Sequence, residues 1–367
     1  MTETGRSDQQ PVRPAWVSDP KGRQPVAPTV PVPGPSEWFY WEGGPPLKGP
    51  LTFADLKRRV MEGEVRLITH VRRREQGDWR EARMVPDLFP YTAEICRDRP
   101  SCLLFLVDQS ESMDEPFGGQ SGQKKSDALA IAINRQLYNL VIVCNGSEGI
   151  LDYFHVGVIG YGSRVDSAWG GKLVGRTLVR VSEIAAAPIG MEKRPMEIAI
   201  GGGKSVTKNV DSPIWIKPEA AGTTPMCEAL ALAKRTVQDF IENQPACYPP
   251  IVINLTDGGQ TDGAPEPHAE ALRALTSTNG NVVLFNAHIS SHTSPPIEFP
   301  MSEEELPTEN AQLLFRMSSR LPPPMQQFAR LEGYNVTDDT RGLVFNADLV
   351  VVYKFLDLGT RRHRNLR

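Results

Sequence analysis

The 367-residue sequence has no run of 18 or more apolar residues, so it offers no candidate for a membrane-spanning helix. Its N-terminus is polar and rich in proline, without the apolar core of a secretion signal. Cysteine is scarce, and no Cys-x-x-Cys pair occurs among Cys96, Cys102, Cys144, Cys227 and Cys247. An odd number of cysteines in mostly apolar surroundings predicts reduced, buried thiols in a cytoplasmic protein.

The sequence also has no excess of basic charge and no recognisable motif of catalytic residues. The net charge of −4 does not favour nucleic acid as a partner. No Gly-x-Ser-x-Gly elbow occurs, and the six histidines show no metalloprotease spacing. His288 and His292 are spaced like a pair of metal ligands, but they lie where a predicted strand passes into a loop rich in Ser and Pro. Gly201–Ser205 lacks the first glycine of a phosphate-binding loop, because Ile198 stands in its place. We therefore expect a protein that is not an enzyme.

The N-terminal quarter of the chain changes character abruptly. Residues 1–35 contain eight prolines, which favour extended conformations and predict a disordered spacer or a ligand for a proline-binding module. Residues 36–92 begin with the aromatic run 38–41 and carry a helical pattern over 55–62. The segment 71–79 supplies further strand residues. The sequence predicts a small α+β domain here.

The same region resembles the GYF-like domains of bacterial proteins. The resemblance rests on the Trp-x-Tyr start, the Gly-Pro-Leu-Thr turn at 49–52 and the late Gly-x-Trp, although the Gly-Tyr-Phe tripeptide is absent. It implies a site for a proline-rich peptide on Trp38, Tyr40 and Trp79. Two alternatives remain open: these aromatic side chains fill a small core, or the Pro-rich segment before the domain occupies its groove.

Residues 95–360 alternate between apolar strands and amphipathic helices. Strands are expected at 101–107, 153–161, 250–256 and 281–288. Helical faces are expected over 129–144 and 226–240. Strands that are apolar on both faces and separated by helices predict an α/β fold, with a doubly wound, mainly parallel sheet.

Several peripheral features complete this domain. Residues 162–221 form an insertion, with an edge hairpin expected near 178–182. A helix is expected over 310–317, and 346–357 fits a helix better than a strand. Residues 361–367 form a basic tail.

Three segments of the large domain carry oxygen ligands at strand or helix ends. Asp108, Ser110 and Ser112 follow the first strand at alternate positions, so they can face one point. Gly222-Thr-Thr-Pro225 precedes a helix, and Asp257-Gly258 follows another strand. Carboxylates and hydroxyls are hard ligands that suit Mg²⁺ or Mn²⁺ and do not suit zinc. Each segment also has an ordinary structural interpretation. The first fits a surface loop, Thr224-Pro225 fits a Thr-capped helix start, and Asp257-Gly258 fits a turn at the end of a strand.

Taken in order, the three segments resemble the metal-ion-dependent adhesion site of von Willebrand factor A (vWA) domains. The resemblance implies a divalent cation on Asp108, Ser110, Ser112, Thr224 and Asp257, the last directly or through water; Thr223 is the alternative to Thr224. It also implies that a position on the metal stays open for an Asp or Glu of a protein partner. Glu111 stands where the family usually has Gly, and we expect it to keep an ordinary φ.

These observations together predict a bacterial, cytoplasmic docking scaffold. The chain is most similar to vWA proteins of the tellurium-resistance cluster, which implies a kinase or phosphatase partner in stress response or phage defence. Two alternatives stay open: an adaptor for an AAA+ ATPase, and a metal-dependent phosphohydrolase.

Overall fold

The computed structural model describes much of the chain. The described residues are 38–41, 47–61, 64–65, 69–73, 78–82, 85, 88, 95–119, 122–146, 149–201, 204–289, 295–347, 351–352 and 354–356. The predictions for residues 1–35, for the tail 361–367 and for His292 lie outside them.

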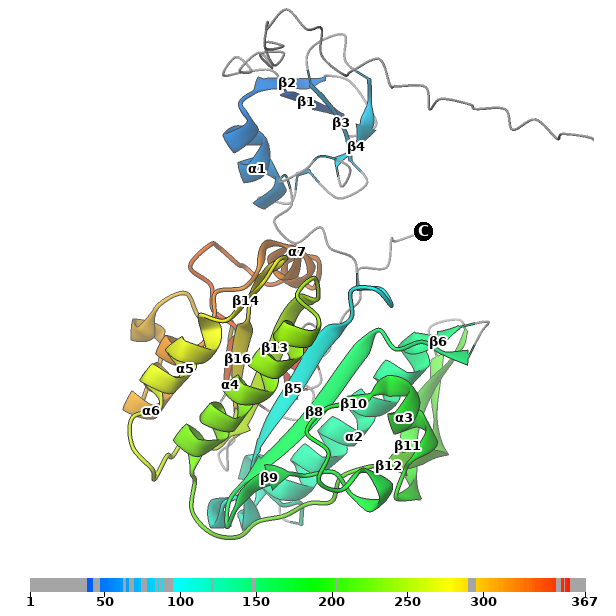
Figure 1. The fold of residues 1–367 in the computed structure, drawn as a ribbon, viewed down its shortest axis with the longest axis vertical. Helices are drawn as coiled ribbons and strands as arrows, with labels where there is room; N and C mark the ends of the chain where they lie inside the picture. Colours follow the sequence, from blue (N-terminus) through cyan, green and yellow to red (C-terminus); the bar gives the residue numbers. More distant parts are fainter. Residues whose placement is uncertain are drawn as a thin grey trace, which may run out of the picture.

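The N-terminal unit is a four-stranded antiparallel sheet with one helix (Figure 1). Its sheet order is β2-β1-β3-β4. The elements are β1 (Trp38–Trp41), β2 (Lys48–Leu51), α1 (Phe53–Met61), β3 (His70–Arg73) and β4 (Arg80–Glu81). Helix α1 begins where Thr52 and Asp55 exchange hydrogen bonds of 2.7 and 3.0 Å, a capping arrangement. Leu56 and Val60, the predicted apolar pair, are buried against the sheet.

An eight-stranded sheet dominates the rest of the chain. Its order is β10-β8-β5-β13-β16-β18-β17, with β9 paired to β8. The neighbours from β8 to β18 are parallel, and β9, β10 and β17 pair antiparallel. The strands are β5 (Ser101–Asp108), β8 (Phe154–Tyr161), β9 (Val165–Ser167), β10 (Val179–Arg180), β13 (Tyr248–Thr256), β16 (Val283–Ile289), β17 (Ile297–Glu298) and β18 (Leu343–Ala347).

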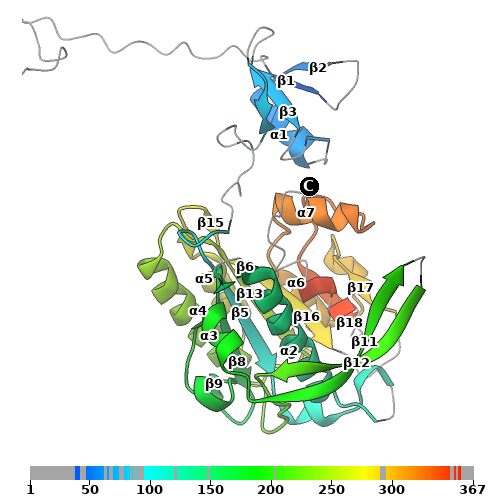
Figure 2. The same cartoon turned by 90° about the vertical axis from the view of Figure 1, so that its right-hand side faces the viewer.

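Helices cover both faces of this sheet (Figures 1 and 2). One face packs against α2 (Lys125–Cys144), α3 (Val181–Ala186) and α7 (Pro323–Leu331). The other packs against α4 (Met226–Asn243), α5 (Glu266–Arg273) and α6 (Glu309–Met317). In β5, Leu103, Phe105 and Val107 enter the first core, and the alternate residues enter the second. The predicted α/β, doubly wound, mainly parallel fold is confirmed.

The main strands and helices agree with the predictions from the sequence, whereas the segment 346–357 agrees only in part. The four predicted strands and the helices over 129–144, 226–240 and 310–317 are present. The segment 346–357 is divided: β18 includes Ala347, and helical turns occur at 351–352 and 354–356. A strand begins this segment because it completes the parallel sheet beside β16.

The insertion contains a hairpin, but it lies elsewhere than predicted. The edge hairpin expected near 178–182 is wrong, because β10 passes directly into α3. The hairpin is formed by β11 (Gly190–Gly201) and β12 (Lys204–Ile214), which appear beside the main sheet in Figure 2. Gly201 and Lys204 belong to these strands, so no helix follows them as a phosphate-binding loop requires.

Two expectations from composition concern the whole chain. All five cysteines are free thiols; four are buried and Cys96 is half-buried. Among the described residues, none of the helices is both long and apolar enough for a membrane span.

Candidate functional site

The candidate site lies where β5 and β13 end side by side. Asp108 is the last residue of β5, and Asp257 directly follows β13. The two strands are parallel neighbours, with Val107 opposite Leu255. The chain leaves β5 toward α2 on one face and leaves β13 toward α5 on the other. Such a switch point is where doubly wound sheets bind ligands.

Asp108 is a buried carboxylate, 1% exposed. One of its oxygens accepts hydrogen bonds from the backbone N–H and the hydroxyl of Ser110, at 2.9 and 2.5 Å. The other accepts from the Thr256 hydroxyl at 2.7 Å. Burial, together with the nearby charge of Asp257, raises the pKa of Asp108 to about 6, although the Ser110 hydrogen bonds oppose this shift. A cation beside Asp108 would therefore relieve an unfavourable buried charge.

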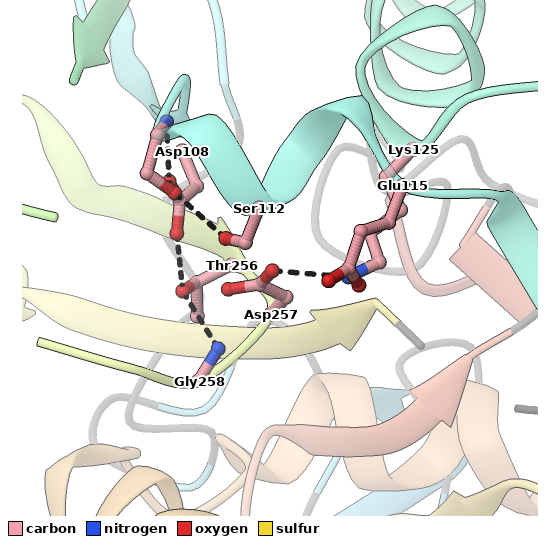
Figure 3. Close-up of polar contacts among 8 residues, drawn as sticks. Asp108, Ser112, Glu115, Lys125, Thr256, Asp257 and Gly258 are labelled. Atoms are coloured by element: carbon pink, nitrogen blue, oxygen red, sulfur yellow. Dashed lines mark hydrogen bonds and ion pairs between the residues drawn. The ribbon is translucent and has the colours of Figure 1, made fainter. Parts of the chain in front are cut away.

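The two serines stand beside this carboxylate. The Ser110 and Ser112 hydroxyl oxygens are 3.0 Å apart, so Asp108, Ser110 and Ser112 form one oxygen cluster. Asp108 and Ser112 are labelled in Figure 3. Glu111 lies in the short 3₁₀ helix η2 (Glu111–Asp114), is exposed and is not among the residues with positive φ. The prediction that it keeps an ordinary φ is confirmed. Its backbone N–H donates to the Gly222 carbonyl at 3.0 Å, which joins this loop to the Thr224 segment.

The Thr224 segment is fixed by close backbone contacts. Gly222 has a φ of +83°, and a Cβ there would lie 2.5 Å from the backbone nitrogen of Ser163, so glycine is required. The backbone N–H of Thr224 donates to the Thr261 hydroxyl, and the Thr261 N–H donates back to the Thr224 carbonyl, both at 3.0 Å. Thr224 is 6% exposed, whereas Thr223 is open to solvent.

Helix α4 begins beside Thr224, but Thr224 does not cap it. The Asp262 carboxylate accepts the backbone N–H groups of Cys227 and Glu228 at 3.0 and 2.9 Å. The alternative interpretation of Thr224 as the helix cap is therefore wrong, because a loop after β13 supplies the cap.

Asp257 is held by a lysine. Lys125, the first residue of α2, places its ammonium 3.0 Å from an Asp257 oxygen and 2.9 Å from a Glu115 oxygen. The Lys125 and Asp257 side chains are only 4% and 11% exposed, whereas Glu115 is 56% exposed. Figure 3 shows the Asp257 carboxylate between Ser112 and Lys125.

The donor set fits a hard divalent cation. In the part of the chain that the structure describes, no group of three or more His, Cys, Asp or Glu residues is placed to hold a metal. A metal at the β5–β13 edge would thus bind through a mixture of one or two carboxylates and neutral hydroxyls. Mg²⁺ and Mn²⁺ accept such ligands and retain water in the remaining positions.

The sequence interpretation gave no role to three residues that shape this site: Thr256, Lys125 and Asp262. Thr256 stands next to Asp257 and its hydroxyl also accepts the Gly258 N–H at 3.0 Å. A signal for Lys125 existed, because a lysine at a helix start is unfavourable beside the helix dipole and calls for acidic partners. Asp262 precedes Pro265 in a turn-rich stretch and gave no comparable signal.

A polar pocket of about 620 Å³ opens beside the site. Gln109, which follows Asp108, forms part of its wall. Its charged lining residues are Arg164, Asp166, Lys172, Lys217 and Glu219, so basic groups are in excess.

The aromatic residues of the small domain divide between core and surface. Tyr40 is 2% exposed and fills the core, so it cannot stack on a peptide. Trp38 is half-buried, whereas Trp79 is 39% exposed. The Arg72 guanidinium lies 4.7 Å from the Trp79 ring centre and 5.4 Å from that of Phe39. The exposed aromatic rings are therefore Trp79, beside the half-buried Arg72 and Phe39, and Trp41, which is 45% exposed.

Comparison with known proteins identifies the small domain. Residues 38–88 match the family GYF domain 2, which confirms the predicted GYF-like domain. No curated protein matches the chain.

Several solved structures are similar to the large domain. The manganese-loaded TRAP protein of Plasmodium vivax aligns with 18% identity over 55% of this chain and 61% of that chain, at a TM-score of 0.28. The PilB minor pilin of Streptococcus sanguinis aligns with 14% identity over 44% and 30%, at 0.26. Three N-terminal domains of the type V pili tip protein Mfa5 of Porphyromonas gingivalis align with 12% identity over 44% and 20%, at 0.24. This chain thus spans 61% or less of each of these structures.

Proposed function

We propose that this protein is a metal-dependent docking scaffold whose β5–β13 edge captures an acidic residue of a protein partner. The observation that carries the proposal is the buried Asp108 carboxylate with two serine hydroxyls at the switch point of a doubly wound sheet. No Lys or Arg of the described chain forms an ion pair with Asp108. A buried carboxylate without a partner cation is costly, and a bound divalent ion removes that cost.

The ligands in this proposal are Asp108, Ser110, Ser112 and Thr224, with Asp257 bound directly or through a water. The metal is Mg²⁺ or Mn²⁺, and its role is that of a Lewis acid that attracts a carboxylate. Neutral hydroxyl ligands leave the ion electrophilic, so a partner's Asp or Glu is a favourable additional ligand. The basic residues lining the adjacent pocket favour an acidic sequence around that anchor.

The small domain supplies a second contact. GYF domains imply a proline-rich peptide as ligand, and here the exposed Trp79 ring, with the Arg72 guanidinium over it, supports this assignment. Aromatic faces with a stacked guanidinium suit the flat, preformed surface of a polyproline helix. The proline-rich residues 1–35 of this chain are one source of such a peptide, and a separate protein is the other.

The cellular setting rests on the resemblance to vWA proteins of the tellurium-resistance cluster. It suggests a bacterial cytoplasmic protein that docks a kinase or phosphatase in stress response or phage defence. An AAA+ ATPase partner remains the alternative of the same kind. A metal-dependent phosphohydrolase is the alternative of another class; it predicts turnover of phosphoesters that is abolished by Asp108→Ala.

The test is an affinity pull-down of the full chain with Mg²⁺, read by mass spectrometry. Two controls accompany it: the wild type with EDTA, and Asp108→Ala with Mg²⁺. The proposal predicts a partner that is present with wild type and Mg²⁺ and lost in both controls. A partner kept in both controls would contradict metal-dependent docking and would assign binding to the small domain or the insertion.

A further inference from the structure

Lys125 is a buried cation built into the rim of the β5–β13 edge. Its side chain is 4% exposed, and it reaches Asp257 across 132 positions of sequence. Burying an ammonium is costly unless it is paired. Its buried partner is Asp257, because Glu115 is mostly exposed and its charge is screened by water. Lys125 and Asp257 therefore form the pair that fixes this side of the site.

The neighbouring lysine shows that this position is unusual. Lys124 pairs with Asp114 at 2.6 Å, but both side chains are more than half exposed. An exposed pair of that kind contributes little to stability or to the local potential. Two adjacent lysines thus carry the same charge, yet only Lys125 acts in a low-dielectric setting, beside the nearly buried Asp257, where charge–charge energies are larger.

We propose that Lys125 determines the specificity of the site by neutralising Asp257, so that a bound divalent ion keeps a net positive charge and recruits an anionic ligand. This inference rests on the proposed metal-dependent docking and adds a role for a residue outside the metal ligands. With Lys125 present, one buried carboxylate, Asp108, remains to offset the two charges of the metal. Without it, both carboxylates offset the metal, and the site loses its attraction for a further carboxylate.

The proposal makes two predictions of opposite direction. Removing the Lys125 charge removes a cation that repels the metal, so the metal binds more tightly. The same change lowers the positive potential of the metal-loaded site, so a carboxylate binds more weakly. A residue that served only to hold the loop would weaken both when lost. The opposite signs thus separate an electrostatic role from a structural one.

The experiment measures Mn²⁺ affinity by titration calorimetry, and acetate affinity by water-proton relaxation of the bound Mn²⁺. Lys125→Met and Lys125→Gln each remove the charge; Gln retains N–H donors toward the carboxylates. Both are expected to bind Mn²⁺ about tenfold more tightly and acetate at least about fivefold more weakly than wild type. Lys125→Arg keeps the charge and Lys124→Met removes the exposed one, and both are expected to stay within about twofold of wild type.

The outcomes separate this inference from the function on which it rests. Wild type without saturable Mn²⁺ binding overturns the metal site and the inference together. Wild type that binds Mn²⁺, with Lys125→Gln unchanged or weaker in Mn²⁺ affinity, overturns the role of Lys125 alone. Tighter Mn²⁺ binding with weaker acetate binding supports the role. Gln serves this comparison if Met impairs folding.

Discussion

Asp108 shows how a single residue makes folding and metal binding interdependent. Its carboxyl has a pKa of about 6 in the folded chain, against an ordinary value of 3.8, because burial disfavours the charged form. Between these two values the folded state holds a proton that the unfolded state has released. Stability contributed by this group is therefore present below pH 3.8 and is lost as the pH rises through 6.

The first prediction concerns the pH dependence of stability without metal. In EDTA, the Asp108 contribution to the free energy of unfolding should fall by about 2 kcal/mol between pH 4 and pH 7.5. Asp108→Asn cannot ionise, so in EDTA it should lose that fall and be more stable relative to wild type at pH 7.5 than at pH 4. Urea unfolding at the two pH values measures the difference. A difference between variant and wild type that is the same at both pH values would contradict this account.

The sequence carried a signal for Lys125 but could not identify its nearly buried partner, Asp257. The cluster of Asp108, Ser110 and Ser112 was predictable because all three stand within a few positions of the end of one strand. The Lys125–Asp257 pair joins the start of α2 to the end of β13, and only the packed sheet brings the two together. Tyr40 is a similar case, since an aromatic residue in a short strand points to core or surface according to a pairing register that the sequence does not fix.

At the scale of elements, long apolar patterns were predictable and short ones were not. The strands β5, β8, β13 and β16 are apolar on both faces because helices cover both sides of the sheet, which gives runs of hydrophobic residues. The alternation at 178–182 resembles a strand but is divided between β10 and α3. A two-residue strand and a six-residue helix are decided by tertiary contacts, which override local preference.

The loop between β13 and α5 also stabilises an element that it does not adjoin in sequence. Asp262 accepts two N–H groups of the first turn of α4, so Asp262→Ala should lower the free energy of unfolding by about 1 kcal/mol. Asp239→Ala, an exposed substitution on the same helix, is the control and should change it by less than about 0.5 kcal/mol. Urea unfolding of both variants gives the comparison. Equal effects of the two substitutions would show that the Asp262 cap does not stabilise α4.

At the scale of the whole molecule, two sites of different chemistry belong to one chain. The GYF domain presents the exposed Trp79 ring beside a guanidinium, whereas the β5–β13 edge presents buried oxygens beside a polar pocket. Two weak contacts with one partner strengthen each other when the geometry allows both to form. Under the proposed function, a partner with an acidic residue and a proline-rich segment would engage both sites.

The central claim is that the β5–β13 edge holds one divalent cation. The most direct measurement is a calorimetric titration of the metal-stripped full chain with Mn²⁺, comparing wild type with Asp108→Ala. We expect one saturable site in the wild type and an affinity at least about 100-fold lower in the variant, because a direct ligand contributes more than the outer-shell partners whose loss costs 10–100-fold. A wild type that binds no Mn²⁺, or a variant that binds it equally well, would contradict the account.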